Sequence, residues 1–363
     1  MTTDQLTILV PTKNRPHFLE RMLNYYAEVG CPFPIRIGDA SDPAEYEEDR
    51  ELVYRYRTRL NLFHDSHQPD FSAHASTVSN LEKSDTPYSV YCGDDDFLVP
   101  RQLARGVEFL EQHPDYSSFS GFSLWLYVRQ DAGRLTIWQT KPVSLRNFTA
   151  DTPEKRVVDW SYPAAMNSFA IQRTHQMRWN WELSAPLCED GDLHGAPLRE
   201  ICYNALSVMA GKSFCTPDLY HVMLRHDDKR FASGSSMDVF ERVLGWKKEN
   251  VDRTLSVLAN VLQKHEGFDL DKYTRDVAWA VLSGWILTVL GRVHKRRLAA
   301  CGFTELTTVS KKSLRQFVAD LPGARPLYRL IMGNGVSVNE LVNPSNVYHK
   351  DFMPVYKVLM AIR

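Results

Sequence analysis

Three aspartates in succession, Asp94, Asp95 and Asp96, directly follow YSVYC, a run that is typical of a buried strand. Like charges this close together repel one another and are costly to remove from water, so either solvent or a positive group must stabilise them. Carboxylates at the end of a strand can bind Mg²⁺ or Mn²⁺, which prefer oxygen ligands and also bridge to phosphates. In an extended segment Asp94 and Asp96 would point to the same side. An acidic turn that caps the next helix is the alternative interpretation.

Polar residues also follow two earlier predicted strands. Asn14 and Arg15 come after LTILV, and Asp39 and Ser41 come at the end of PIRIGD. In open α/β sheets, ligands bind outside the carboxyl ends of the strands. Asp39 and Ser41 could hydrogen-bond a base or a ribose, although the same residues suit an Asx turn. Three strand ends with polar side chains favour a ligand site over three separate turns.

The loop after the first strand, VPTKNRP, contains no glycine. It matches neither G-x-G-x-x-G nor G-x-x-x-x-G-K-[ST], so it lacks the signatures of a Rossmann dinucleotide site and of a P-loop. A nucleotidyltransferase needs a glycine-rich phosphate loop at this position. A D-x-D phosphatase needs its nucleophilic aspartate there, where this chain has Pro11 and Thr12. Both of these enzyme classes are therefore disfavoured.

Taken together, the motifs resemble the family 2 type of GT-A glycosyltransferases over residues 5–230. The resemblance rests on P-T-x-N-R after the first strand, D-x-S after the second, and Y-S-V-Y-C-G-D-D-D-F ahead of a helix that begins with proline. It implies a nucleotide-diphosphate-sugar donor, with a UDP-sugar as the first expectation, and a bound Mn²⁺ or Mg²⁺ ion. It also implies sugar transfer with inversion to a hydroxyl of a saccharide, a lipid-linked or a protein acceptor in glycan or glycoconjugate biosynthesis.

The resemblance also implies roles for single residues, with the base expected at Asp39 and the ribose or sugar at Asp94 or Asp95. The residues expected around the donor, including Asn80 on a neighbouring helix, are Pro11, Thr12, Asn14, Arg15, Asp39, Ser41, Asn80, Asp94 and Asp95. The residues expected to hold the metal ion are Asp96, Asp94 and His226. The family often has two acidic residues after the second strand, whereas the first position here is Gly38, which leaves the identity of the base open.

Transfer with inversion needs a group that removes the proton of the acceptor hydroxyl. The family supplies it from an E-D pair at the start of a late helix, and Glu189-Asp190 in APLCEDGDLHG looks like that pair. Asp190 is therefore the expected base, with Glu189 beside it and Asp192 as the alternative. Acidic residues that stabilise a helix N-terminus would give the same pattern.

Histidines near these motifs are ambiguous. His226 follows the strand-like YHVML, and a lone histidine beside a strand end is more often structural than a ligand. His64, His67 and His74 have spacings that fit no short zinc motif, and no cysteine joins them. We expect these three to be loop residues beside the donor.

The elements that must position these residues alternate along the chain, which predicts an α/β fold with a GT-A-like, doubly wound, mostly parallel sheet. The predicted strands cover residues 6–10, 34–39, 61–65 and 88–92, and the predicted helices cover residues 16–29, 44–60, 76–82 and 100–113. Residues 119–128 and 134–140 predict an antiparallel hairpin. We expect a catalytic domain over residues 1–230 and an appended all-helical region over residues 231–363.

The helical region is expected to follow a Gly/Ser-containing linker, KRFASGSSM. Its apolar run 277–291 is shorter than the ~20 residues of a spanning helix, which favours a buried helix. The basic run RVHKRR at 292–297 leaves open contact with a membrane surface. Support of the acceptor side or formation of a homo-oligomer would also account for this region.

Bulk properties exclude several classes of partner and compartment. The net charge is -1 with mixed charges, so the chain shows no sign of binding nucleic acid. The six cysteines are scattered and form no C-x-x-C pair, and the N-terminus does not read as a signal peptide. These features predict a cytoplasmic protein, with the inner face of the membrane as a further site of action. A catalytically silent module that binds nucleotide-sugars or proteins is the alternative to an enzyme.

Overall fold

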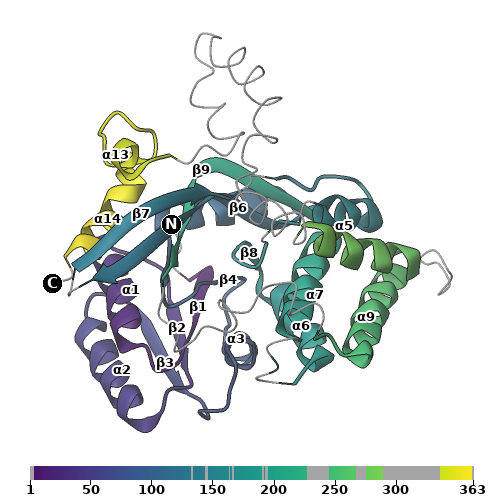
Figure 1. Cartoon of the computed structure of the whole chain (residues 1–363), viewed down its shortest axis with the longest axis horizontal. Helices are drawn as coiled ribbons and strands as arrows, with labels where there is room; N and C mark the ends of the chain where they lie inside the picture. Colours follow the sequence, from purple (N-terminus) through teal and green to yellow (C-terminus); the bar gives the residue numbers. More distant parts are fainter. Residues whose placement is uncertain are drawn as a thin grey trace, which may run out of the picture.

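The computed structural model describes residues 4–131, 134–143, 146–162, 164–165, 167–189, 192, 195–226, 245–266, 275–288 and 336–361. Within these residues the strands form one sheet in the order β3-β2-β1-β4-β8-β6-β9-β5, with β7 paired to β6 (Figure 1). The strands are β1 (Leu6–Thr12), β2 (Ile35–Asp39), β3 (Leu62–Ser66), β4 (Tyr88–Tyr91), β5 (Asp96–Leu98), β6 (Tyr116–Asp131), β7 (Arg134–Pro142), β8 (Ile171–Arg173) and β9 (Lys212–Arg225).

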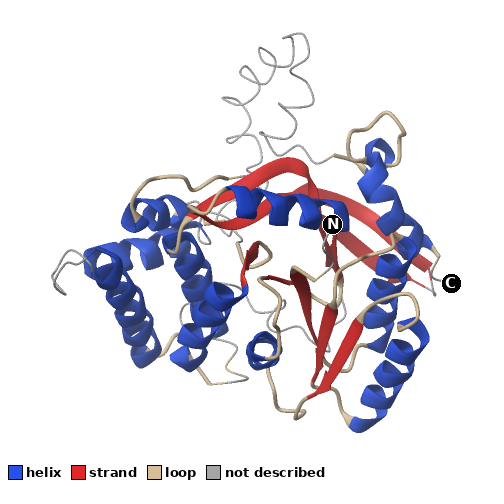
Figure 2. Cartoon of the chain, turned by 180° about the vertical axis from the view of Figure 1, so that it is seen from behind, coloured by secondary structure: helices blue, strands red, loops and turns tan. Residues whose placement is uncertain are grey.

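Most of the helices fall into two groups on opposite sides of the molecule, as Figure 2 shows from behind. One group contains α1 (Pro16–Glu28) and α2 (Pro43–Tyr56), with α14 (His349–Met360) packed against α1. The other contains α5 (Pro153–Ser161), α6 (Thr174–Ser184), α7 (Ala196–Met209) and α9 (Lys248–Glu266). The remaining named α-helices are α3 (Ala73–Glu82), α4 (Pro100–Gln112) and α13 (Val338–Leu341).

The half of the sheet formed by β3, β2, β1 and β4 is parallel, and β1 lies at its centre. Beyond β4 the sheet is mixed, because β8 pairs antiparallel with both β4 and β6, whereas β6 and β9 are parallel. The predicted α/β class with a wound parallel sheet is confirmed. The predicted hairpin is also confirmed as β6 and β7, and both strands extend beyond the predicted ranges.

Strand β1 is buried on both faces, as expected for a central parallel strand. Leu6, Ile8 and Val10 enter the core that contains α1, α4 and α14, whereas Leu9 packs on the opposite face with Leu81 of α3. This alternation follows from the period of two in a strand. Every side chain of β1 is thereby packed in a core, and this packing anchors the loop that carries Asn14 and Arg15.

The described C-terminal helices belong to two different cores. α9 and the helix over residues 275–288 pack with α5 and α7, whereas α13 and α14 pack on the core of β1 and α1. The linker and the basic run at 292–297 lie outside the described residues. The division at residue 230 stays a prediction. None of the helices in the described ranges is long and apolar enough to cross a membrane.

The packing of α14 predicts that the last described helix stabilises the N-terminal core. Phe352 is fully buried there, so Phe352→Ala should lower the free energy of unfolding by about 3–5 kcal/mol, measured by urea denaturation. Lys350→Ala, at an exposed position of the same helix, is the control and should change it by less than about 0.5 kcal/mol. A loss below about 1 kcal/mol for Phe352→Ala would mean that α14 does not contribute to this core.

Candidate active site

The ends of β1, β2 and β4 meet at one edge of the sheet. Thr12, the last residue of β1, pairs in register with Asp39, the last residue of β2. The Thr12 hydroxyl donates a hydrogen bond of 2.8 Å to Oδ2 of Asp94, which follows β4. Neighbouring parallel strands end together, so residues far apart in sequence contact one another here. The strand ends expected to carry the site therefore lie together, and the binding of a ligand there stays a prediction.

The positive group between the aspartates is the guanidinium of Arg15. Its Nε donates to Asp94 Oδ2 at 3.1 Å, its Nη2 donates to Asp94 Oδ1, and its Nη1 donates to Asp95 Oδ2 at 3.3 Å. Asp94 is fully buried, and this burial raises the pKa of its carboxyl to about 7 although Arg15 and the Thr12 hydroxyl act in the opposite direction. Arg15 thus offsets the repulsion within the triplet, together with the contacts that Asp95 and Asp96 make.

Arg15 is directed toward the aspartates by the residue before it. Asn14 has a φ of 53°, a left-handed conformation that asparagine tolerates better than most residues. Its backbone N–H donates to Ser41 Oγ at 2.7 Å, and its side chain exchanges hydrogen bonds of 2.9 and 2.7 Å with Asp42. These contacts tie the loop after β1 to the loop after β2. Asn14 and Ser41 therefore lie at the predicted edge, where they fix the two loops.

Asp95 contacts a histidine that follows β9, a strand in the other half of the sheet. His226, directly after β9, places Nε2 at 2.8 Å from Asp95 Oδ2, and its ring lies 4.4 Å from that of Phe18. Burial alone would raise the pKa of Asp95, but the hydrogen bond from His226 and the charge of Arg15 outweigh it and hold the pKa below its usual range. Both side chains keep some exposure to solvent, 20% for Asp95 and 15% for His226, so a ligand can reach this pair.

Asp96 makes its contacts to β9. Its Oδ1 accepts a hydrogen bond of 3.2 Å from the backbone N–H of Leu224, and its Oδ2 lies 3.4 Å from Nε2 of His221. The chain forms a turn at Asp94 and Asp95 and is not extended there, so the argument that would point Asp94 and Asp96 to the same side does not apply. Asp96, the first residue of β5, thus bonds to Leu224 of β9, which lies two residues before His226 in the sequence.

His221 was not predicted from the sequence. It is fully buried, and within the described part of the chain neither ring nitrogen has a hydrogen-bond partner that meets normal geometry. Its ring lies 4.6 Å from that of Phe169. The one available signal was a histidine inside YHVML, an otherwise apolar strand, which indicates a buried polar group in need of a partner.

At the end of β2, Asp39 is fully buried and its carboxylate is held on both oxygens. Oδ1 accepts from the Ser41 backbone N–H at 2.8 Å, and Oδ2 lies 2.9 Å from His64 Nε2. The Ser41 hydroxyl in turn donates to Asp49 at 3.3 Å. Burial and the nearby Asp39 raise the pKa of Asp49 to about 8. Asp49 was also not predicted, because it lies within the charged helix α2.

The glycine that departs from the family pattern has a packing reason. A Cβ on Gly38 would lie 2.3 Å from Ser76 Oγ and 2.8 Å from the amide atoms of Asn80, both on α3. The Ser76 hydroxyl donates to the Gly38 carbonyl oxygen at 2.9 Å, so α3 approaches β2 too closely for any side chain. Asn80 is itself fully buried and donates to the carbonyl oxygen of Arg36 at 3.4 Å, which is a contact between α3 and β2.

Of the remaining predicted site residues, the structure describes Pro11, Glu189 and Asp192. Pro11 is buried within β1 opposite Gly38. Glu189 is exposed, whereas Asp190 lies outside the described residues. Asp192 accepts a hydrogen bond from the Gly195 backbone N–H at 3.0 Å. No distance therefore relates Asp190 to the aspartates, and its role stays a prediction.

The structure also limits the ways in which a metal ion can bind. In the described ranges, no three His, Cys, Asp or Glu side chains are arranged as a metal cage. Mg²⁺ and similar ions are commonly held by one or two protein ligands together with substrate phosphates and water. Two adjacent ligands of an octahedral ion at ~2.1 Å are roughly 3 Å apart. Asp95 and His226 are hydrogen-bonded at 2.8 Å, so an ion held by both would replace the proton between them.

No family model and no curated protein matches the chain. Among solved structures, a crystal structure of S. aureus TarS matches with a TM-score of 0.41 at 16% identity, covering 80% of this chain and 82% of that one. S. aureus TarS in complex with UDP-GlcNAc matches at 0.40 and 16%, covering 78% and 81%. The mannosyltransferase PcManGT from Pyrobaculum calidifontis, in complex with GDP-Man and Mn²⁺, matches at 0.39 and 14%, covering 90% and 84%.

The buried carboxyl of Asp49 predicts a specific pH dependence of stability. The unfolded chain loses this proton at an ordinary pKa, whereas the native chain keeps it up to a pH of about 8. The stabilisation by the protonated form is therefore complete only below the ordinary carboxyl pKa, declines steadily as the pH rises above it, and is gone once the pH has passed about 8. Asp49→Asn keeps an uncharged group of the same shape and should be more stable than the wild type at about pH 9 by roughly 1–3 kcal/mol.

Urea denaturation of both proteins at about pH 5 and at about pH 9 measures this difference. Glu47→Gln, on the same helix but exposed, is the control and should show no such trend. An equal gap between wild type and Asp49→Asn at both pH values would contradict the raised pKa.

Proposed function

We propose that the chain is a metal-dependent glycosyltransferase that moves a sugar from a nucleotide-diphosphate-sugar to an acceptor hydroxyl, with inversion, in glycan or glycoconjugate biosynthesis. The observation that supports this most is the convergence of three separate segments on one acidic site. Thr12 and Arg15 contact Asp94, and Arg15 and His226 contact Asp95, at the edge of the sheet where ligands of open α/β folds bind. These are also the positions of the family 2 motifs.

We assign the metal ion, Mn²⁺ or Mg²⁺, to Asp95 and His226 rather than to the predicted set of Asp96, Asp94 and His226. The Asp94 oxygens are occupied by Thr12 and Arg15, and Asp96 is turned toward β9. A carboxylate oxygen suits either ion, and an imidazole nitrogen beside it favours Mn²⁺ over Mg²⁺, which binds nitrogen ligands weakly. When bound, the ion supplies positive charge against the negative charge that develops on the leaving diphosphate.

The chain's own residues then bind the donor at the ends of β1 and β2. Pro11 and Thr12 end β1 next to the proposed nucleotide position. Thr12 and Arg15 occupy the oxygens of the buried Asp94, so of the two aspartates expected at the ribose or sugar the partly exposed Asp95 is the one that we assign to it. Ser41 and His64 fix the Asp39 carboxylate at the end of β2, where we propose that the base lies. A UDP-sugar remains the first donor to test.

For the chemical step we propose Asp190 as the base. Its carboxylate would accept the proton of the acceptor hydroxyl while the hydroxyl oxygen forms a bond to the anomeric carbon. The bond from that carbon to the diphosphate oxygen breaks at the same time, so the nucleotide diphosphate leaves with the electron pair and the anomeric configuration inverts. The cytoplasmic site of action, expected from the cysteine pattern, stays a prediction.

The metal assignment predicts different effects for two neighbouring aspartates. Asp95→Asn and His226→Gln should each weaken the Mn²⁺-dependent part of UDP-sugar binding by about 10- to 100-fold, because each removes one metal ligand. Asp96→Asn, which keeps an oxygen acceptor for the Leu224 N–H, should weaken it by less than about 3-fold. Isothermal titration calorimetry with UDP-sugars, with Mn²⁺ and then with chelator, measures these affinities.

Two results would contradict the assignment. A large loss of metal-dependent binding in Asp96→Asn, with Asp95→Asn unaffected, would return the metal to Asp96. The absence of binding for every nucleotide-sugar in a panel that includes GDP-sugars would favour the catalytically silent module.

The assignment of the base predicts a separation of binding from catalysis. Asp190→Asn should abolish sugar transfer and leave donor affinity within about 3-fold, because the amide cannot accept the proton. Transfer to an acceptor and calorimetric donor binding are measured on the same preparation. Asp192→Asn, measured alongside, tests the alternative base and should keep sugar transfer, since Asp192 contacts the Gly195 backbone. A fully active Asp190→Asn protein would move the role to Glu189 or Asp192.

A further inference from the structure

The β6–β7 hairpin, which runs beside β9 in Figure 1, carries aromatic side chains that belong to none of the described cores. Along β6, Leu124, Leu126 and Val128 enter the core that contains β1. Because a strand has a period of two, Trp125 and Tyr127 point to the opposite face of the sheet. We call that face the aromatic face, and its members are Trp125, Tyr127, Arg129, Trp138, Lys141 and Arg225.

Trp138 reaches the aromatic face through a β-bulge. Tyr127 pairs with Gln139, and the next pair is Val128 with Ile137, which leaves Trp138 as the extra residue of β7. Trp138 is 55% exposed, and its ring lies 5.2 Å from that of Tyr127. A bulge disrupts the ladder of hydrogen bonds and is common where a side chain is re-aimed, often next to an active site. The backbone thus positions this exposed ring beside Tyr127.

Two guanidinium groups border these rings. Arg225, the last residue of β9, pairs with Tyr127, and its guanidinium lies 3.9 Å from the centre of the Trp125 ring. Arg129 lies two positions beyond Tyr127 on β6 and is exposed. Across the described ranges, the side chain of neither arginine donates a hydrogen bond or forms an ion pair. Lys141 adds a third cation, and the described side chains of β6 and β7 include no carboxylate, so the aromatic face attracts negative charge.

The aromatic face lies next to the candidate active site. Arg225 ends β9, and the next residue, His226, contacts Asp95. The rings of Tyr127 and Trp138 follow Arg225 across the paired strands, away from the aspartates. A chain-shaped ligand on the aromatic face therefore has one end beside Asp95 and His226.

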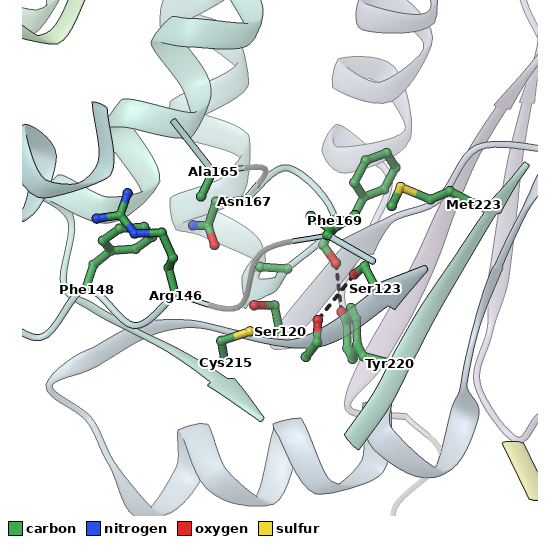
Figure 3. A pocket seen from close by; sticks show the side chains of 13 residues that line it. Ser120, Ser123, Arg146, Phe148, Ala165, Asn167, Phe169, Cys215, Tyr220 and Met223 are labelled. Carbon is green, nitrogen blue, oxygen red and sulfur yellow. Dashed lines mark hydrogen bonds between the residues drawn. The ribbon is translucent and has the colours of Figure 1, made fainter. Parts of the chain in front are cut away.

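In the opposite direction along β9, the same side of the sheet leads to a small pocket, which Figure 3 shows with Met223 at its edge. The Tyr220 hydroxyl donates to the Phe169 carbonyl oxygen at 2.7 Å, and the Ser123 hydroxyl donates to the Gly121 carbonyl oxygen at 3.2 Å. These hydroxyls already have partners within the protein. The groups that suit a ligand on this side of the sheet are therefore the rings and arginines of the aromatic face.

We infer that the aromatic face binds an acidic saccharide chain, which is the extended part of the acceptor. The designation as acceptor rests on the proposed function, whereas the binding of the chain does not. The rings of Trp138 and Tyr127 offer flat apolar surfaces to the apolar sides of pyranose rings. Arg225 and Arg129 pair with carboxylate or phosphate groups along the chain, because a planar guanidinium matches both. Rings bordered by cations suit such a ligand better than the apolar centre of a protein interface, which is depleted of charge.

Affinity electrophoresis tests this inference with no donor present. The native protein is run through gels that contain polygalacturonate, a phosphorylated mannan, or methyl-esterified polygalacturonate, which has the same rings without the charge. We expect at least one of the two acidic polymers to retard the protein and the neutral ester to bind about 10-fold more weakly. Which of the two acidic polymers binds distinguishes a carboxylate from a phosphate.

Variants on the aromatic face should separate its two kinds of contact. Trp138→Ala and Arg225→Gln should each weaken binding of the acidic polymer by about 10-fold, and Trp138→Phe should retain part of the affinity because it keeps a ring. Tyr54→Ala is the matched control and should bind as the wild type. Tyr54 is also an exposed ring, at 64%, with the guanidinium of Arg57 at 3.9 Å, but it lies on α2.

Four results would overturn the inference. They are equal binding of the neutral ester, no binding of either acidic polymer, unchanged binding by Trp138→Ala, and self-association of the wild type that Trp138→Ala abolishes in sedimentation. The last would assign the aromatic face to a second copy of the chain. Because neither donor binding nor transfer is measured, these results are independent of whether nucleotide-sugars bind.

Discussion

The ion pair of Arg15 with Asp94 and Asp95 is the interaction on which the arrangement of the site depends. Two unit charges 4 Å apart interact by about 4 kcal/mol at an effective dielectric constant of 20, so adjacent buried carboxylates cannot remain together without a counter-charge. Arg15 provides it from the loop after β1, and the left-handed Asn14 directs it there. Both carboxylate oxygens of Asp94 then accept hydrogen bonds from Arg15 and Thr12, whereas Asp95 also contacts His226 and keeps some exposure to solvent. This inequality between neighbouring aspartates is the basis for placing the metal ion at Asp95.

The rest of the sheet serves to hold these segments in register. β1 is buried on both faces, and this packing holds Thr12 in a fixed position beside Asp94. β9 reaches the same edge from the other half of the sheet and is joined to β5 through Asp96, which sets the position of His226. The third aspartate thus has a structural contact that explains its presence in the triplet without a ligand.

The strand ends could be predicted from sequence because alternating apolar runs and the polar residues after them are local signals. The same signals placed Thr12, Asp39 and Asp94 at one edge, since parallel strands must end together. The partners of these residues could not be predicted in the same way. The Arg15 contact joins positions separated by 79 residues, and His221 reaches Asp96 only because β9 pairs with β5. Such pairings depend on strand order, which periodicity does not encode.

Departures from the family pattern have different origins. The close approach of α3 to β2 explains why residue 38 is a glycine, so the glycine carries no information about which base the donor has. The contacts of Asp96 with β9 follow from the turn at Asp94 and Asp95 before β5. The expectation from sequence treats this segment as extended and so does not include the turn. The predicted base and the linker lie outside the described residues, so their roles depend on solution experiments.

The most direct test of the account is anomalous X-ray diffraction from crystals of the protein grown with UDP and Mn²⁺. We predict a single strong manganese peak within coordination distance of Asp95 and His226 and of the diphosphate, with Arg15 still paired to Asp94. A manganese peak coordinated by Asp96, or by Asp94 with Arg15 displaced, would contradict the account.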